Sequence, residues 1–119
     1  KKPSIEYDLD INFNDISPKL LRIINQMAPF GPKNTRPVFA THNCIDTGRT
    51  RIVGDDKIHL QLDIFDPTGI RLSGIGFGLG YLLKEIKKVS SFSVLYTIEE
   101  NEFRGDKNLQ LKIKDIKTT

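Results

Sequence analysis

Apolar and polar residues alternate over several stretches of this chain, a pattern that is typical of half-buried β-strands. The alternation predicts strands over residues 5–13, 38–45, 58–65, 92–101 and 108–116. In residues 58–65 the apolar positions from Ile58 to Ile64 are expected to face inward. A short basic strand is expected between the turn signals Thr47-Gly48 and Gly54-Asp55, and residues 102–107 are expected to connect the last two strands.

Two helical segments interrupt the strands. Residues 18–28 repeat apolar side chains at helical spacing between Leu20 and Met27, which predicts a helix with one apolar side. Ser17 is suited to cap this helix, and Pro18 fits its first position. Pro29 prevents the helix from continuing. Residues 80–88 predict a second, shorter helix.

The segment 66–77 contains a turn and a change of phase. Residues 66–69, Asp-Pro-Thr-Gly, have the composition of a β-turn. After the turn, apolar residues occupy Ile70 and Leu72, and beyond Gly74 they occupy Ile75 and Phe77. We expect a β-bulge or a sharp bend at Gly74, because a small barrel needs such bends to close.

The predicted order of elements favours a mainly β fold. Five coiled strands, with a helix before the last pair, describe an OB-fold, a five-stranded Greek-key barrel, here preceded by a strand and a short helix. A β-sandwich and an SH3-like barrel are the competing architectures. We expect residues 1–36 to be a terminal strand, helix and proline-rich corner from a preceding domain or linker, and residues 37–119 to be the OB-fold domain.

Composition limits the classes of function. The 119 residues carry a net charge of +3, and residues 17–59 hold seven basic and three acidic residues, a net of +4, which favours a polyanionic partner. The single Cys44 allows no internal disulfide, so a reduced, cytoplasmic setting is expected. No apolar run approaches about 18 residues, and the acidic, alternating N-terminus does not resemble a signal peptide, so no membrane span is expected.

The sequence contains no clear motif for catalysis or for cofactor binding. Glycines occupy positions 74, 76, 78 and 80, but no register satisfies the G-x-G-x-x-G pattern of dinucleotide loops. Cys44 with a histidine could form a catalytic pair or part of a zinc site, and Asp8 with Asp10 could bind a metal ion. Neither alternative is favoured, because a complete set of ligands or of catalytic groups is missing. We therefore expect neither a catalytic residue nor a metal or cofactor site in this chain.

Single-stranded nucleic acid is the favoured partner, because cations that follow phosphates alternate with flat side chains along the predicted strands. Phe65 is a candidate face for stacking on a base. The candidate phosphate contacts are Lys33, Arg36, Arg49, Arg51, Lys57, His59, Arg71 and Arg104. A protein-docking module without direct DNA contact is the alternative hypothesis.

Several blocks along the chain resemble, in the same order, the C-terminal region of the RecJ family of single-stranded-DNA-specific 5′→3′ exonucleases. The resemblance covers about residues 5–116. Its most specific residues are Pro29-Phe30-Gly31-Pro32 with Asn34 and Pro37, His59-Leu60, Gly76-Phe77, Asn101, Arg104-Gly105, Leu109-Gln110-Leu111 and Asp115-Ile116. Lys33 stands where the family often has glycine.

The resemblance implies an OB-fold appended to a two-domain phosphoesterase core that cuts DNA with divalent metal ions, Mg or Mn. The acidic and histidine motifs of that core do not occur in these 119 residues. The chain is therefore expected to be inactive alone and to grip single-stranded DNA beside the nuclease groove, in contact with the core and with other DNA-repair proteins.

Overall fold

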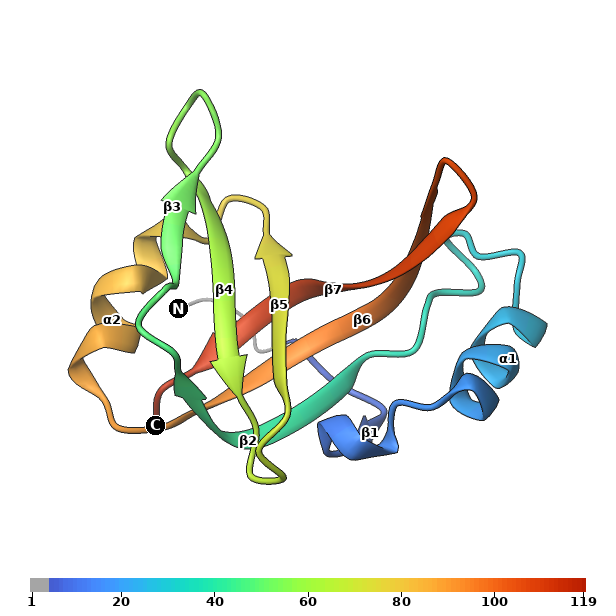
Figure 1. Ribbon diagram of the computed structural model, residues 1–119, viewed down its shortest axis with the longest axis horizontal. Helices are drawn as coiled ribbons and strands as arrows, with labels where there is room; N and C mark the ends of the chain where they lie inside the picture. The colour runs from blue at the N-terminus through green and yellow to red at the C-terminus, as the bar shows by residue number, and fades with distance from the viewer. Residues whose placement is uncertain (1–4) are drawn as a thin grey trace.

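Four of the five alternating stretches form long strands, and five strands in all close into a barrel (Figure 1). The computed structural model describes residues 5–119. Its elements are β1 (Leu9–Asp10), the 3₁₀ helix η1 (Phe13–Asp15), α1 (Pro18–Gln26), β2 (Phe39–Asp46), β3 (Arg51–Val53), β4 (His59–Phe65), β5 (Arg71–Gly76), the 3₁₀ helix η2 (Gly80–Leu82), α2 (Leu83–Lys88), β6 (Phe92–Phe103) and β7 (Asp106–Lys117).

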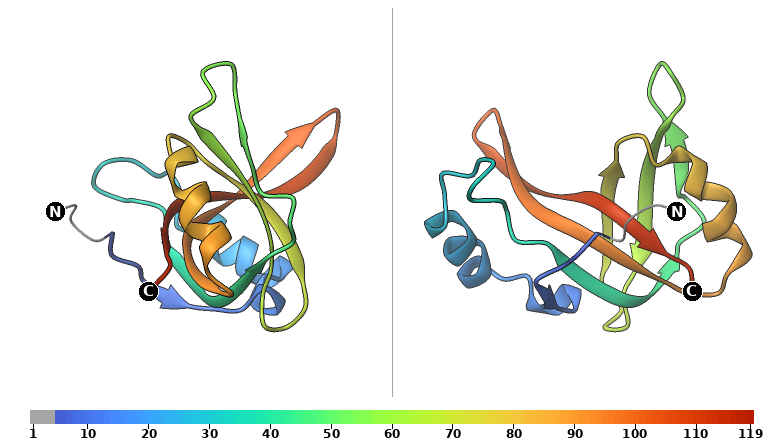
Figure 2. Two further views of the ribbon diagram at one scale, coloured as in Figure 1. Left: turned by 90° about the vertical axis from the view of Figure 1, so that its left-hand side faces the viewer. Right: turned by 180° about the vertical axis from the view of Figure 1, so that it is seen from behind.

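The pairing of the strands confirms the predicted OB-fold. Strand β2 pairs with β6, β6 with β7, β7 with β5, β5 with β4, and β4 returns to β2 where Ile45 lies opposite Phe65. All of these pairs are antiparallel except β5–β7. This ring excludes an open sandwich, and α2 lies across one end of the barrel (Figure 2, left).

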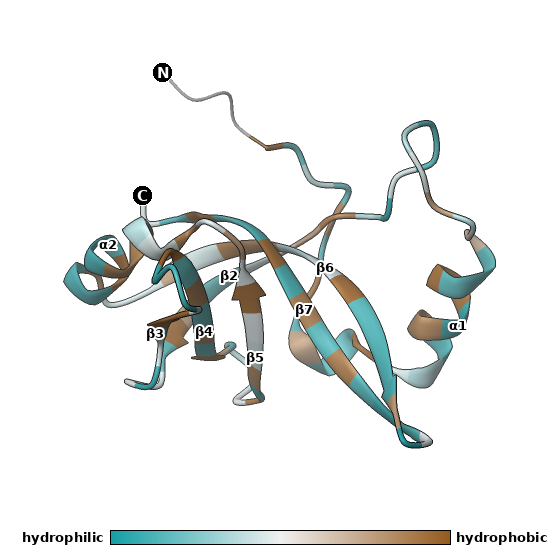
Figure 3. Ribbon diagram, turned by 90° about the horizontal axis from the view of Figure 1, so that it is seen from above, coloured by the Kyte–Doolittle hydropathy of each residue, from teal (hydrophilic) through white to brown (hydrophobic). Residues whose placement is uncertain are grey.

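The interior is filled by the apolar positions of the alternating strands. Leu60, Leu62, Ile64, Val94, Tyr96 and Leu111 are all buried. Figure 3 shows the alternation directly as hydrophobic and hydrophilic bands along β7. Ile58 is half exposed just before β4, so its predicted inward position is wrong.

The predicted strand over residues 5–13 is wrong in length. Only Leu9 and Asp10 pair, in parallel with β2, and the side chain of Leu9 is exposed. The segment is fixed instead by Phe13, which is buried against Tyr96, and by His42. The two ring nitrogens of His42 lie 2.7 Å from Asp10 Oδ1 and from Ser93 Oγ, and the bond to His42 lowers the pKa of Asp10.

Helix α1 begins as predicted and ends two residues early. The Leu20 N–H donates to Ser17 Oγ at 3.1 Å, and Pro18 occupies the first turn. The helix stops at Gln26 rather than at Ala28. Ile24 is buried in the core, whereas Ile23 and Met27 are exposed, so the apolar side of α1 is narrower than expected.

No bulge occurs at Gly74. The β4–β5 register runs without a shift from Leu60↔Gly76 to Phe65↔Arg71, so the inward side of β5 continues through Leu72, Gly74 and Gly76. Ile75 points outward and Ile70 is exposed. The irregularities that bend the barrel lie in β2, between Thr41 and Cys44, and in the β6–β7 pair, at Leu95–Tyr96.

Gly74 serves close packing rather than bending. It lies opposite Leu111 in the parallel β5–β7 pair, and a Cβ placed on it would come 2.8 Å from the Leu111 carbonyl oxygen and 2.8 Å from Ile113 Cδ1. Only glycine lets these two backbones approach so closely. The closure of the barrel therefore depends on the missing side chain at this position.

Strands β6 and β7 form a hairpin that extends well beyond the barrel (Figure 1). Their connection is not residues 102–107 but the two residues Arg104 and Gly105, both with positive φ. Two such residues form the tight turn that suits the twist of a hairpin. We call residues 99–110 the arm.

Asp66 joins the N-terminal segment to the barrel. Its Oδ2 accepts the Phe13 N–H at 2.8 Å, while Oδ1 accepts from the Thr68 N–H, the Thr68 hydroxyl and the Ile70 N–H. The side chain thus organises the predicted turn at residues 66–69 and holds a segment 53 positions earlier in the chain. No helix among residues 5–119 is long and apolar enough to cross a membrane.

Gly74→Ala is expected to destabilise the fold by about 1–3 kcal/mol, because the added methyl group forces β5 and β7 apart. Urea unfolding measures this loss. Gly31→Ala is the matched control, since a Cβ at Gly31 meets no atom within 4 Å, and its effect should stay within about 0.5 kcal/mol. Equal unfolding midpoints for the two variants would contradict the role of Gly74.

Asp66→Ala is expected to lower the free energy of unfolding by about 1.5–3 kcal/mol, because it leaves the buried Phe13 N–H and the part-buried donors of the turn without a charged acceptor. Amide hydrogen exchange should also become faster at Phe13, which lies 53 positions before Asp66 in the sequence. The control is Asp55→Ala, which removes an exposed acid from the loop between β3 and β4. Unchanged exchange at Phe13 would show that the Asp66 bond does not hold the N-terminal segment.

Candidate nucleic-acid interface

The sheet register aligns one residue from each of five strands on the outer side of the barrel, although the last of them, Thr97, is buried. Gln61 lies opposite both Arg51 and Ile75, Ile75 lies opposite Lys112, and Lys112 lies opposite Thr97. We call these five residues the central row. Because neighbouring strands are separated by about 4.8 Å, the row crosses the barrel over about 19 Å. In OB-folds the face of the second and third barrel strands, here β4 and β5, is the one that binds oligonucleotides and oligosaccharides.

An aromatic pair adjoins the row. The side chain of Phe77 is 59% exposed, and its ring lies edge-on to His59 with the centroids 5.3 Å apart. Lys112 Nζ lies 5.9 Å from the centroid of the Phe77 ring. His59 Nδ1 accepts the Gly78 N–H at 2.9 Å, and Nε2 faces Asp56 at 3.4 Å. His59 therefore orients the loop that carries Phe77, and both of its ring nitrogens have partners within the protein.

Three arginines line a groove at the β3 end of the row. Arg49, Arg51 and Arg71 surround it, together with Gln61, Asp63 and Ser73. Asp63 is its one acid, so the groove carries a net charge of +2. We call it the arginine groove.

Arg71 is held inside this groove by Asp63. Its Nε and Nη2 donate to the two Asp63 oxygens at 2.7 and 2.8 Å. The hydrogen bond to Arg71 holds the pKa of Asp63 below its usual value, and the same bond raises the pKa of Arg71. The carboxylate accepts two hydrogen bonds from the guanidinium, which are the same bonds that a phosphate group would accept.

The remaining candidate residues do not line the arginine groove, although Phe65 adjoins it through its cross-strand neighbour Arg71. Phe65 is 39% exposed at the far end of β4, opposite Arg71. Lys57 lies in the loop before β4, beside an apolar patch around Ile58. Arg104 stands at the tip of the arm, with its guanidinium carbon 5.2 Å from the centroid of the Phe103 ring.

Lys33 and Arg36 belong to the proline-rich corner, residues 29–37. Lys33 is exposed between Gly31 and Asn34, whose backbone groups bond to each other. Arg36 lies over the Phe30 ring, 4.5 Å from its centroid. The residues that the sequence predicted as DNA contacts therefore lie in three separate places: the barrel face, the tip of the arm and the corner.

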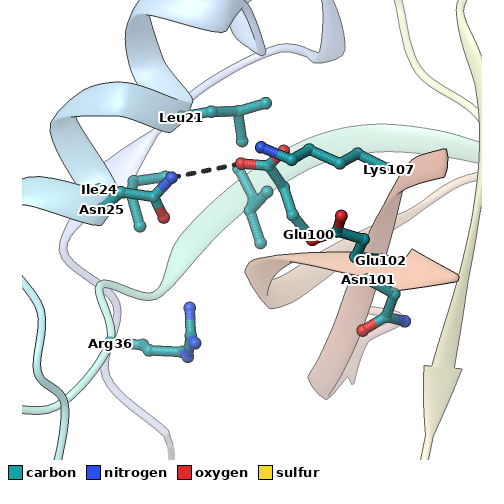
Figure 4. Close-up of a pocket in the computed structure, with 9 residues that line it drawn as sticks. Leu21, Ile24, Asn25, Arg36, Glu100, Asn101, Glu102 and Lys107 are labelled. Carbon is teal, nitrogen blue, oxygen red and sulfur yellow. Dashed lines mark hydrogen bonds between the residues drawn. The ribbon is translucent and has the colours of Figure 1, made fainter. Parts of the chain in front are cut away.

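Another pocket separates α1 from β6 and the arm (Figure 4). Asn25 Nδ2 donates to Glu100 Oε1 across it at 3.3 Å. The lining contains two cations, Arg36 and Lys107, and two carboxylates, Glu100 and Glu102, so it carries no net charge. This balance does not favour a polyanion, and the pocket is not part of the interface described above.

The structure does not assemble the catalytic pair or the metal site that the sequence left as alternatives. Cys44 is buried, burial raises the pKa of its thiol to about 12, and its Sγ faces the Thr41 carbonyl rather than a histidine. Asp10 bonds His42, and Asp8 accepts the Val38 N–H. Within residues 5–119, no three His, Cys, Asp or Glu side chains are grouped in a way that fits a metal ion.

Sequence reasoning missed Phe77, Ile75 and Lys112 as parts of this face. Phe77 and Ile75 were predicted to point inward because a phase change was expected at Gly74. A continuous alternation through Gly74 would have placed both on the outer side with Arg71. Lys112 and Lys114 were visible as outward positions of the last strand, but their neighbours depend on the β5–β7 pairing, which no local pattern reveals.

Comparison with known proteins agrees with this geometry. A family model described as the RecJ OB domain matches residues 7–115. The single-stranded-DNA-specific exonuclease RecJ of Bacillus subtilis is 30% identical over 113 residues, which are 95% of this chain and 14% of that protein. The protein of the same name from Haemophilus influenzae is 27% identical over 112 residues, 92% of this chain and 19% of that protein.

The chain therefore spans less than a fifth of the length of either relative. The family model, in contrast, covers nearly all of it, including the barrel, α1 and the corner. The closed five-stranded ring, the helix across its end and this match lead to one conclusion: the chain belongs to the RecJ OB domain family.

Proposed function

We propose that this domain binds single-stranded DNA across the outer face of β3, β4, β5 and β7. The central row carries the proposal, because it joins Arg51 to Lys112 without interruption by an acid. Phe77 stands exposed beside the row, where a base can stack on its ring. Cations for phosphates and an aromatic face for bases are the two requirements of single-strand binding.

The parent activity is part of the same proposal. The relatives are named as single-stranded-DNA-specific exonucleases, and we propose that this domain holds the substrate for such a 5′→3′ exonuclease in DNA repair and recombination. The divalent Mg or Mn ions of that reaction belong, in this proposal, to a catalytic core outside these residues. A cytoplasmic setting remains a prediction from the sequence.

A protein-docking module is the second candidate, and one observation favours it. Ile52, Ile58 and Tyr81 form an exposed apolar patch between β3 and η2, on the side of Lys57. Protein interfaces often centre on such patches. Binding through this patch should be insensitive to salt, which distinguishes it from contacts with phosphates.

Arg51→Ala and Lys112→Ala are each expected to weaken binding of a labelled oligothymidylate of about 12 nucleotides. Each should also make the log–log dependence of affinity on salt shallower by about 0.7, the amount that one phosphate contact contributes in single strands. Fluorescence anisotropy at several salt concentrations measures both quantities. Lys88→Ala, which removes an exposed charge from α2, is the matched control.

Two results would contradict this proposal. One is the absence of oligonucleotide binding by the unaltered chain at low salt. The other is an equal loss of affinity for Lys88→Ala and for the two central-row variants, which would indicate net charge rather than a defined face.

Asp63→Asn is expected to strengthen DNA binding, because it removes the acid that occupies Arg71. Affinity should rise, and the salt dependence should become steeper by about 0.7 as Arg71 gains a phosphate. The same anisotropy titration measures this, and a thermal melt checks that the variant is folded. Weaker binding by folded protein would show that Asp63 positions Arg71 for DNA instead of competing with it.

A further inference from the structure

A second groove continues from the far end of the central row. It lies between the proline-rich corner and the outward side of β7 and β6, with Phe30, Arg36, Thr97, Glu99, Lys112 and Lys114 in its lining. We call it the corner groove. Lys112 and Thr97 belong both to this groove and to the central row, so the two surfaces are continuous.

The corner that forms one wall of this groove is fixed by its own hydrogen bonds. Asn34 Nδ2 donates to the carbonyl oxygens of Met27 and Pro29 at 2.7 and 2.9 Å. The backbone groups of Gly31 and Asn34 exchange two bonds of 2.8 and 3.0 Å. The backbone of this wall is therefore already ordered before binding, which removes the cost of ordering the loop.

Two of those side chains form a flat surface. The guanidinium carbon of Arg36 lies 4.5 Å from the centroid of the Phe30 ring, which is a cation–π contact. Phe30 is partly buried against the core, so its ring is anchored from behind. Aromatic rings and guanidinium planes are the surfaces on which unstacked bases rest.

The opposite wall supplies positive charge. Lys112 and Lys114 follow each other on the outward side of β7, and with Arg36 they give three cations against the single acid Glu99. Within residues 5–119, neither Arg36 nor Lys112 makes an ion pair. The pKa of Lys114 is lowered, first by burial and then by Lys112. This crowding of like charges is relieved when an anion enters.

We propose that the corner groove is a second nucleotide subsite for the same single strand, which crosses the central row and leaves beneath the corner. A phosphate lies between Arg36 and the two lysines, and the adjoining base lies against the Phe30–Arg36 surface. This inference rests on the proposed function and extends it, because it gives the proline-rich corner a direct role in holding the strand.

The test compares two oligothymidylate lengths in the anisotropy assay, about 4 nucleotides to fill the central row and about 10 to reach the corner. Arg36→Ala should weaken binding of the longer oligonucleotide about tenfold and leave that of the shorter one unchanged. Phe30→Leu keeps an apolar anchor but removes the flat ring, and it should act in the same length-dependent way. Arg36→Lys should recover part of the loss, because it keeps the charge.

Each other outcome has a defined meaning. Unchanged affinity of Arg36→Ala and Phe30→Leu for the longer oligonucleotide overturns the subsite while the proposed function stands. An equal loss for both lengths also overturns it, because the corner then acts through the fold or the main face. If the unaltered chain binds neither length at low salt, the proposed function and this inference fall together.

Discussion

The parallel contact between β5 and β7 is the constraint on which the rest of this structure depends. Only Gly74↔Leu111 and Ile75↔Lys112 pair these strands, and the absence of a side chain at Gly74 is what permits the approach. Without that contact the barrel would remain open along one seam. The same two pairs place Lys112 beside Ile75, so closure of the core and continuity of the outer face have one cause.

The charges of this domain matter through their placement more than through their sum. A net charge of +3 is modest for a DNA-binding protein. The arginine groove and the corner groove nevertheless each hold three cations against one acid, at opposite ends of the central row. Arg36 also lines the pocket behind α1, where the charges of Arg36 and Lys107 are balanced by Glu100 and Glu102. An extended polyanion therefore meets favourable potential along one path across the barrel.

Local patterns predicted the β-strands well because the barrel buries one side of each. Ser17 with Pro18, the alternation in β4 and β7, and the turn at residues 66–69 are all signals that depend on neighbours in sequence. The order of the predicted elements already favoured a closed five-stranded barrel, and the family resemblance implied the same fold. Errors arose where contacts between residues distant in sequence determine the structure. The N-terminal segment is fixed by the packing of Phe13 rather than by the alternation around it. Gly74 is required by the close approach of β7 rather than by a bulge. The proposed path for DNA combines residues from five strands and the corner, and it depends on those distant pairings.

The central claim is that a single strand lies along the row from Arg51 to Lys112 and continues under the corner. Amide chemical-shift mapping of the isotope-labelled chain with an unlabelled oligothymidylate tests it most directly. The account predicts the largest shifts at Arg51, Gln61, Ile75 and Lys112, further shifts at Phe30 and Arg36, and little change in α2. Shifts concentrated around Ile52, Ile58 and Tyr81, or spread evenly over all basic surfaces, would contradict it.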